Sequence, residues 1–376
     1  MVGTQRIGAG TAAYRGIARG GLRPVDPAAV RVTVLVPAHN EQDQIAETIA
    51  SLLAQSRTPD RIVVVADNCT DRTVEIAARY PVRVVTTVGN TAKKAGALNQ
   101  VLDGLLPDCT ERDAILVMDA DSTLATGFLA HAVERLATGT YAAVGGTFTG
   151  KPGGGFVGML QRNEYARYAR DVNRRKGRVL VLTGTATLFR ADVLTEVVTA
   201  RADGALPGSP HVYDTHVLTE DNELTLAVLH LGYRIVSPKQ CTLTTEVMPT
   251  WRALFRQRLR WKRGALENLL DYGCTRVTVS YWRRQAMSLV GIVVAAAYLG
   301  SLAYALVLHG AIHLSPLWTV VTAVFALERA VSVRRRGPAM MALGATVVVE
   351  MVFDVFLQAA QTCAFVQTAV RAERRW

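Results

Sequence analysis

Short apolar runs alternate with amphipathic patterns through the first third of the chain. β-branched residues concentrate in runs that predict buried strands, at residues 32–36, 61–66, 82–86 and 114–118. Between these runs apolar residues recur at helical spacing, which predicts helices at residues 45–53, 72–79 and 95–106. Asp71 is the expected N-cap of the second helix. This alternation predicts an α/β fold with a doubly wound, mostly parallel sheet.

Acidic side chains follow two of the predicted strands. Asp67 ends the second strand, and Asp119 and Asp121 follow the fourth. Residues two apart at a strand end point to the same side, so Asp119 and Asp121 are expected to face one ligand. Ligands of such sheets bind at the carboxyl ends of the strands, and Mg²⁺ takes one or two carboxylates together with substrate phosphates. A solvated strand end with a turn is the alternative interpretation.

A second acidic motif, Thr219-Glu220-Asp221, precedes an apolar pattern of helical spacing. Carboxylates at a helix start complement the helix dipole, which is the plain structural interpretation. A carboxylate in this position can also accept a proton from a substrate hydroxyl, which is the role of a general base.

A basic amphipathic helix is predicted over residues 250–263, with Thr250 as its N-cap. Within it Gln257, Arg260 and Trp261 fall at i, i+3 and i+4 and share a face. An arginine can neutralise a diphosphate, and an indole offers a flat surface to a sugar ring. A membrane anchor with an interfacial tryptophan is the alternative.

Apolar segments dominate the last third of the chain. Residues 286–308 contain no charge and are long enough to span a bilayer, and residues 311–333 are a second candidate. The third segment, 338–367, contains Glu350 and Asp354, which share a helix face. They are expected to point into the helix bundle or toward a polar pathway. A third span is favoured over a bent or re-entrant hairpin.

Basic residues accompany these apolar segments. From Trp251 onward 16 Lys and Arg oppose 6 Asp and Glu, which places +10 of the net +11 there. Charge in this position indicates attraction to anionic lipid headgroups rather than to nucleic acid. Arg283, Arg284 and residues 334–336 mark cytoplasmic ends by the positive-inside rule. Dispersed cysteines indicate reduced thiols, and residues 1–30, which lack the apolar run of a secretory signal, are expected to be a flexible leader.

Two further polar segments lie beside the predicted strands and helices. Pro37-Ala38-His39-Asn40-Glu41 follows the first strand, and Lys94 opens a helix, where it is a candidate phosphate contact. His211 and His216 lie five apart in a polar loop, and a polar loop is favoured over a metal pair.

Taken in order, these motifs resemble those of family 2 glycosyltransferases. The motifs that carry the resemblance are Val36-Pro37-Ala38-His39-Asn40-Glu41, Asp67, Lys94-Ala95-Gly96, Asp119-Ala120-Asp121, Gly184-Thr185, Thr219-Glu220-Asp221 and Gln257-x-x-Arg260-Trp261. Over roughly residues 30–270 the chain is similar to the membrane-bound processive branch, which includes poly-N-acetylglucosamine, chitin-oligosaccharide, hyaluronan and cellulose synthases. The resemblance implies a GT-A-like fold, a UDP-sugar donor and Mg²⁺ or Mn²⁺.

The resemblance also implies a role for each matching residue. Asp221 would be the general base, oriented by Glu220, and Asp121 with Asp119 would hold the metal. The residues implied to contact the nucleotide-sugar are Pro37, Asn40, Glu41, Asp67, Lys94, Asp119, Gln257 and Arg260. The residues implied to contact the acceptor are Gly184, Thr185 and Trp261.

The implied function is a membrane-anchored inverting glycosyltransferase that transfers a hexose or N-acetylhexosamine, for example N-acetylglucosamine, to a growing β-linked oligo- or polysaccharide. The alternative is transfer of one sugar to a polyprenyl phosphate or another lipid. A non-catalytic subunit with a degenerate domain is disfavoured, since such a domain would be expected to have lost one of the carboxylates. The departure from the processive branch is the small membrane region, because no span is predicted before residue 30.

The expected organisation has four parts. They are the leader (1–30), a cytosolic GT-A-like domain (31–248), interfacial helices (249–284) and a transmembrane region of about three helices (285–370). The expected location is the inner or plasma membrane, with the catalytic domain cytoplasmic. The expected partners are the UDP-sugar, a saccharide or lipid-linked acceptor and membrane lipids, with no nucleic acid. A homo-oligomer or an accessory subunit is left open.

Overall fold

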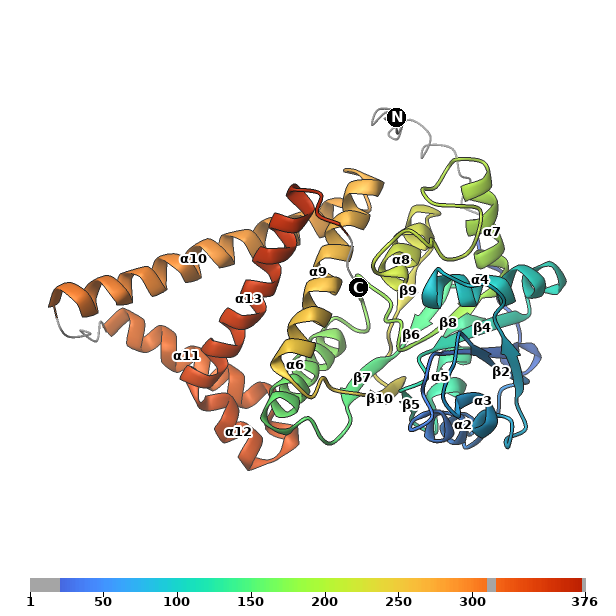
Figure 1. The fold of residues 1–376 in the computed structure, drawn as a ribbon, viewed down its shortest axis with the longest axis horizontal. Helices are drawn as coiled ribbons and strands as arrows, with labels where there is room; N and C mark the ends of the chain where they lie inside the picture. Colours follow the sequence, from blue (N-terminus) through green and yellow to red (C-terminus); the bar gives the residue numbers. More distant parts are fainter. Residues whose placement is uncertain (1–20, 310–315, 374–376) are drawn as a thin grey trace. The chain divides into compact units, whose positions relative to one another are not determined.

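The computed structural model describes residues 21–309 and 316–373, in two compact units (Figure 1). The first unit consists of the residues up to Lys151, Asp171–Glu246 and Asn268–Thr278. The second combines Pro152–Arg170 and Val247–Glu267 with the residues from Val279 onward. Each unit gathers segments that are far apart in the sequence, so tertiary contacts rather than chain order define it.

A seven-stranded sheet forms the middle layer of the described part of the first unit. Its strands, in spatial order, are β3 (Arg83–Thr86), β2 (Arg61–Ala66), β1 (Arg31–Ala38), β4 (Asp113–Met118), β8 (Ala186–Arg190), β6 (Ala143–Gly145) and β9 (Ile235–Val236). β8 runs antiparallel to β4 and β6, and the other described pairs of this sheet are parallel. The predicted mostly parallel sheet is therefore confirmed, and its four predicted strands are β1 to β4.

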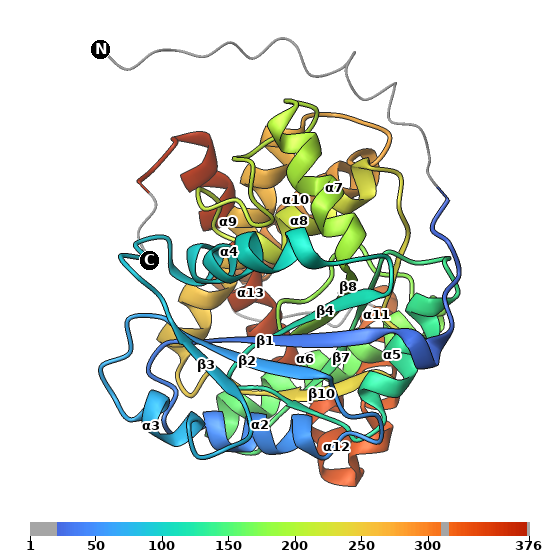
Figure 2. The same ribbon diagram turned by 90° about the vertical axis from the view of Figure 1, so that its right-hand side faces the viewer.

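Helices cover both faces of this sheet (Figure 2). The helices of the first unit are α2 (Ile45–Leu53), α3 (Thr73–Ala77), α4 (Lys93–Leu105), α5 (Phe128–Ala137), α7 (Ala191–Ala202) and α8 (Glu220–His230). In Figure 2, α2, α3 and α5 lie on one face of the sheet and α4 and α7 on the other. Alternate residues of β1, such as Val34, pack with Ile49 of α2 and Phe128 of α5 in the main core. Asp71 accepts a hydrogen bond from the Thr73 amide (3.0 Å), but the N-cap residue of α3 is Arg72, so the predicted N-cap lies one residue too early.

The strand order reverses between β1 and β4. The chain passes from β1 outward to β2 and β3, and then returns to place β4 on the other side of β1. At such a switch point the connections leave in opposite directions, which opens a crevice at the carboxyl ends of the strands. The first unit therefore carries its expected ligand crevice beside Ala38 and Met118.

A second, three-stranded sheet was not predicted. It has the order β5 (Thr123–Leu124), β10 (Thr242–Thr245) and β7 (Thr147–Gly150). Its strands are two to four residues long, too short for a distinct apolar pattern. It brings the Thr245 hydroxyl within 3.4 Å of Asp121.

Helices make up the second unit. They are the larger parts of α6 (Gly155–Arg174) and α9 (Trp251–Tyr272), with α10 (Val279–His309), α11 (Pro316–Ser332), α12 (Pro338–Ala345) and α13 (Val347–Ala369). Thr250 accepts a hydrogen bond from the Ala253 amide (3.2 Å), which confirms the predicted start of α9. Leu254 of α9 is buried against α6 and α13 in a small core of its own.

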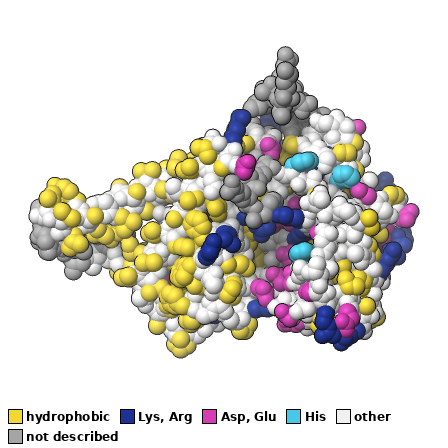
Figure 3. Space-filling view, viewed as in Figure 1, with side chains coloured by type: hydrophobic (Ala, Val, Ile, Leu, Met, Phe, Trp, Pro, Cys, Tyr) yellow, Lys and Arg dark blue, Asp and Glu magenta, His cyan; other side chains and the backbone are white. Residues whose placement is uncertain are grey.

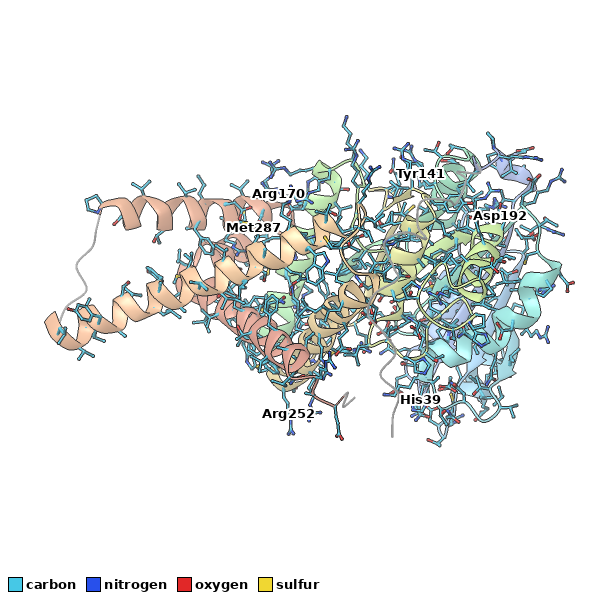
Figure 4. The ribbon with its side chains drawn as sticks, turned by 90° about the horizontal axis from the view of Figure 1, so that it is seen from above. His39, Tyr141, Arg170, Asp192, Arg252 and Met287 are labelled. Carbon is cyan, nitrogen blue, oxygen red and sulfur yellow. The ribbon has the colours of Figure 1, made fainter. Side chains whose placement is uncertain are left out.

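Two described helices, α10 and α13, are long and apolar enough to cross a membrane. The most apolar stretch of α10 is entirely unburied, whereas 28% of that of α13 is buried. Figure 3 shows hydrophobic side chains spread over the face formed by these helices, and Figure 4 labels Met287 of α10 among them. Residues 311–315 of the second predicted span lie outside the described residues. The third predicted segment is two helices that meet at Thr346, rather than one.

Glu350 and Asp354 of α13 pair with arginines inside the second unit. Arg167 of α6 lies 3.0 Å from Glu350, and Arg329 of α11 lies 2.5 Å from Asp354. The Glu350 side chain is fully buried. The two carboxylates therefore point into the helix bundle, which is one of the two predicted orientations.

Residues 1–20 of the predicted leader lie outside the described residues. Beyond them, Pro27–Ala29 form a short 3-10 helix capped by Asp26, and Val30 is buried in the core. The folded chain therefore begins before residue 31.

Candidate active site

Asp67 stands at the carboxyl end of β2, next to the switch point. Its Oδ1 accepts hydrogen bonds from the Thr87 hydroxyl and the Asn90 amide, both at 2.8 Å. The His39 Nδ1 lies 2.6 Å from the Asp67 carbonyl, which ties the loop after β1 to β2 (His39 is labelled in Figure 4). These contacts fix Asp67 in one orientation at the edge of the crevice.

Lys94, the second residue of α4, lies between the two acidic motifs. Its ammonium is 2.5 Å from Asp119 and 3.4 Å from Glu220. Burial by itself would lower the pKa of Lys94, but the charges of Asp119 and Glu220 outweigh it and raise the pKa above its ordinary value. Lys94 is therefore a permanent cation that holds carboxylates from β4 and α8 together.

Several carboxylates gather around Asp121. Burial, and then the negative charges of Asp121 and Glu246, raise the pKa of Glu41 to about 7. Such an excess of negative charge is relieved by a hard cation, and the carboxylate pair of Asp119 and Asp121 is the donor set that Mg²⁺ or Mn²⁺ accepts. Within residues 21–309 and 316–373 no three His, Cys, Asp or Glu side chains converge as a metal site. The residues therefore fit a cation that completes its coordination with substrate oxygens and water.

Asp221 lies in the first turn of α8 and is held by two backbone amides. Its Oδ2 accepts from the Gly184 amide (2.9 Å) and its Oδ1 from the Asn222 amide (2.8 Å). Burial and the charge of Glu220 raise the pKa of Asp221 to about 6, against the opposing charge of Lys94. A carboxylate with this pKa is ionised at neutral pH and is a stronger proton acceptor than an ordinary aspartate.

Gly184 leaves little room for a side chain. A Cβ added at this position would lie 3.1 Å from the Lys94 ammonium and 3.4 Å from Asp221 Oδ2. A larger residue would therefore require Lys94 or Asp221 to shift by a few tenths of an ångström.

Lys94, Gly184, Glu220 and Asp221 line one small cavity in the first unit. The residues that line it are Lys94, Val117, Leu182, Thr183, Gly184, Thr187, Phe189, Tyr213, Glu220 and Asp221. Tyr213 was missed by sequence reasoning because it lies in an irregular loop with no motif. It is buried, and burial raises the pKa of its phenol above the ordinary value, so the hydroxyl remains a hydrogen-bond donor.

Other predicted contacts have structural partners at the same edge. Pro37 pairs in register with Val65 inside the sheet. The Asn40 side chain accepts a hydrogen bond from the Thr70 amide (2.8 Å), and the Thr185 carbonyl accepts one from the Asp119 amide (3.2 Å). Pro37 and Thr185 make these contacts through their backbones, and Asn40 makes its contact through its side chain.

Gln257, Arg260 and Trp261 lie on α9 in the part that belongs to the second unit. Arg258, which was not predicted, connects two of them: it donates to Gln257 (2.9 Å) and lies over the Trp261 ring at 4.5 Å. Arg258 also contacts α6, where it pairs with Glu164 (2.7 Å) and lies 5.7 Å from the centre of the Tyr165 ring. In a segment with so many arginines, no sequence signal singles this one out.

His211 and His216 have separate acidic partners. His211 lies 3.0 Å from Asp103, and His216 lies 3.2 Å from Asp214. The favoured interpretation of a polar loop agrees with these contacts.

The first unit thus combines a cation, a carboxylate pair and a basic carboxylate at one end of a parallel sheet. This set can bind a diphosphate, stabilise negative charge on it and remove a proton from a hydroxyl. These are the requirements of group transfer from a nucleotide diphosphate.

The model of the family described as "Glycosyltransferase like family 2" matches residues 27–264, which is more than half of the chain. The chain therefore belongs to glycosyltransferase family 2, and the predicted resemblance is confirmed. Sugar transfer is the class of reaction that this membership supports.

Two curated relatives agree with this assignment. "Probable glycosyltransferase YdaM" of Bacillus subtilis is 29% identical over 62% of this chain and 55% of its own length. "Poly-beta-1,6-N-acetyl-D-glucosamine synthase" of Staphylococcus aureus is 25% identical over 72% of this chain and 64% of its own length. The chain therefore spans less than two thirds of each.

A solved structure agrees with the fold. The mannosyltransferase PcManGT from Pyrobaculum calidifontis, in complex with GDP-Man and Mn²⁺, has a TM-score of 0.59 and is 20% identical. The match covers 96% of this chain and 93% of that one. The GT-A-like fold predicted from the sequence is thereby confirmed.

Proposed function

We propose that this protein is a membrane-anchored inverting glycosyltransferase that transfers a hexose or N-acetylhexosamine from a UDP-sugar to a growing β-linked oligo- or polysaccharide. The observation that carries the proposal is that Lys94, whose ammonium is 2.5 Å from Asp119, lines one small cavity together with Asp221. A diphosphate leaving group and an attacking hydroxyl need a cation and a base within one small space, and these residues provide both.

The donor binds across the carboxyl ends of the strands. Asp67 contacts the nucleoside, with Pro37, Asn40 and Glu41 forming the adjoining wall. Gln257 and Arg260 of α9 bind the diphosphate, since arginine forms strong charge-assisted hydrogen bonds with phosphate oxygens. Asp119 and Asp121 hold Mg²⁺ or Mn²⁺, which when bound neutralises charge on the diphosphate.

The acceptor approaches from the side of Gly184 and Thr185, and its sugar ring stacks on Trp261. The acceptor oxygen attacks the anomeric carbon while the bond from that carbon to the UDP oxygen breaks. Asp221 takes the hydroxyl proton, and Glu220 together with Lys94 orients it. A single displacement inverts the configuration, so an α-linked donor gives a β-linked product.

The S. aureus relative, a poly-β-1,6-N-acetyl-D-glucosamine synthase, supports N-acetylglucosamine as the sugar and a polymer as the product. The unburied apolar surface of α10 and the neighbouring Arg283 and Arg284 support anchoring at the inner or plasma membrane. This orientation leaves the first unit in the cytoplasm, where nucleotide-sugars are supplied.

The alternative is transfer of one sugar to a polyprenyl phosphate or another lipid. Of the described helices, α10 and α13 are long and apolar enough to cross a membrane, which favours this alternative. Two helices cannot surround a polymer channel unless several copies of the protein associate. The GDP-Man in the structure of the P. calidifontis mannosyltransferase adds a GDP-sugar to the donors that need testing.

The test is release of nucleoside diphosphate by the detergent-solubilised protein, with Mn²⁺ or Mg²⁺, across a panel of UDP-sugars and GDP-mannose. Mass spectrometry then identifies the products. A ladder of evenly spaced masses supports the polymer synthase, and a single glycolipid supports the alternative. No release from any donor, in the presence of membrane lipid extract as a source of acceptor, would contradict both.

A further inference from the structure

The first turn of α8 carries Glu220 and Asp221, and a buried side chain from α9 secures it. The Thr219 side chain makes no capping hydrogen bond to the helix. Instead Asn268, which is fully buried, donates to the Thr219 carbonyl (3.1 Å) and to the Asn222 side chain (3.0 Å). The residues on both sides of Glu220 and Asp221 are therefore held by one amide group.

One turn further along α8, Glu223 is a buried carboxylate with a partner on each oxygen. Its Oε1 accepts from the Tyr272 hydroxyl (2.6 Å), and its Oε2 lies 2.5 Å from the Arg201 guanidinium. Burial raises the pKa of Glu223, while Arg201 and Tyr272 oppose the rise. Glu223 thus joins α8 to α7 on one side and to the end of α9 on the other.

Arg201 extends the same network to the cavity. Its guanidinium also donates to the carbonyls of His211 (2.8 Å) and Val212 (2.9 Å), directly before Tyr213. Asn99 of α4 pairs with both backbone groups of Tyr213, at 2.8 and 3.0 Å. The network therefore reaches α4, the helix whose second residue is Lys94.

Stability alone is a weak reason for such a network. The attraction within a buried ion pair barely offsets the free-energy cost of removing both charges from water, and apolar residues of the same size often stabilise a core equally well. Satisfied polar networks do fix a unique geometry, because each hydrogen bond has a required direction. This network touches three of the elements that line the cavity, namely α4, α8 and the loop at 211–213.

We infer that Asn268 and Tyr272 are positioning residues for the transfer step. They act through Thr219, Asn222 and Glu223. Their effect is to fix Glu220 and Asp221 against Lys94. The inference rests on the proposed function. It also gives α9 a second role, because the helix that carries Gln257, Arg260 and Trp261 ends in these two residues. Displacement of a base by about 1 Å can cost on the order of a hundredfold in rate, so loss of one hydroxyl is expected to be measurable.

Tyr272→Phe is the test, and Tyr233→Phe is its matched control. Each substitution removes one phenol hydroxyl that donates to a glutamate. Tyr272 donates to the buried Glu223, and Tyr233 donates to the half-buried Glu196. Glu196 is on α7 and has no part in the cavity lining. We expect Tyr272→Phe to lower kcat about tenfold with a donor KM within about twofold of the wild type, and Tyr233→Phe to change neither. Asn268→Ala is expected to act like Tyr272→Phe.

Hydrogen exchange of the full-length protein provides a readout that does not depend on turnover. Peptides covering residues 211–226 should exchange faster in Tyr272→Phe than in Tyr233→Phe at matched melting temperature. Equal exchange and equal kcat in the two variants would overturn the inference. A parallel loss of kcat and UDP affinity in Tyr272→Phe, explained by a lower melting temperature, would overturn it as well. If the wild type transfers no sugar, the proposed function fails, and the exchange difference alone then decides whether the network positions α8.

Discussion

One ion-pair cluster from each unit, built from the same residue types, shows two opposite uses of a carboxylate paired with a basic side chain. In the first unit Lys94 pairs with Asp119 and Glu220, whose side chains remain 31% and 18% exposed. In the second unit Arg167 pairs with Glu350, whose side chain is fully buried. In a partly exposed ion pair, either side chain can leave the other to bind a substrate phosphate or a cation. In a fully buried ion pair the two side chains stay together and stabilise the fold. The exposed fraction of the paired side chains, rather than their residue type, therefore distinguishes the candidate site from an ion pair that only stabilises the fold.

The units differ equally in their apolar residues. Core residues of the first unit such as Val34 and Ile49 are buried between the sheet and its helices, whereas residues of α10 such as Val293 are exposed along the helix. Exposed apolar surface of this extent is a feature of segments that meet lipid or another protein. The exposed apolar surface of α10 therefore supports the proposed membrane anchor.

The largest expected effect is from Asp221→Asn. The amide cannot take the acceptor proton, so turnover is expected to fall by about 10²–10⁴-fold. Nucleoside diphosphate release measures the loss, and the melting temperature shows whether the fold is retained. Retention of wild-type turnover would remove Asp221 from the proposed mechanism.

Glu350→Ala tests the contrasting unit. It leaves Arg167 buried without its partner, which is expected to destabilise the second unit by about 3–5 kcal/mol. The matched control is Glu328→Ala, which removes an exposed partner of Arg170 and should cost about 0–1 kcal/mol. Thermal unfolding in detergent compares them, and equal melting temperatures would contradict the assignment of Glu350 to the fold.

Removal of the metal tests the carboxylate pair. Chelation should abolish turnover, with recovery on addition of Mn²⁺ or Mg²⁺, and Asp121→Asn should lower turnover by about a hundredfold or more at a fixed metal concentration. A titration of activity with Mn²⁺ should require more metal for the variant. Full activity in the presence of a chelator would exclude a metal role for Asp119 and Asp121.

The smallest effect concerns pH. Because burial and Glu220 raise the pKa of Asp221 to about 6, its ionised form is lost as the pH falls through that value. The rate kcat/KM should therefore fall about tenfold per pH unit below 6 and be level above it. A profile that stays level down to pH 4.5 would indicate that another group accepts the proton.

The elements of the first unit could be predicted because their signals are local. β1 to β4 and the helices between them follow runs of Val, Ile and Leu whose period is visible without tertiary contacts. The acidic residues that end β2 and β4 could be placed at one edge, since parallel strands align their carboxyl ends. The roles predicted for Gln257, Arg260 and Trp261 stay predictions.

The rest depended on contacts between distant residues. β8 enters the sheet antiparallel, β5 and β10 pair across more than a hundred residues, and Tyr213 reaches the cavity from a loop without a motif. The third apolar segment breaks at Thr346, where the backbone leaves the helical region. No periodic pattern marks any of these features.

The family, the mostly parallel sheet and the residue types available for catalysis follow from local periodicity and ordered motifs, so they can be predicted from the amino-acid sequence. The contacts of the site cannot: Lys94 joins Asp119 to Glu220, and the Gly184 amide holds Asp221. Asn268 and Tyr272 secure α8 in the same way, through contacts between distant residues. Hydrogen bonds and ion pairs act over about 3 Å between side chains that the fold alone brings together, so their partners cannot be read from spacing along the chain.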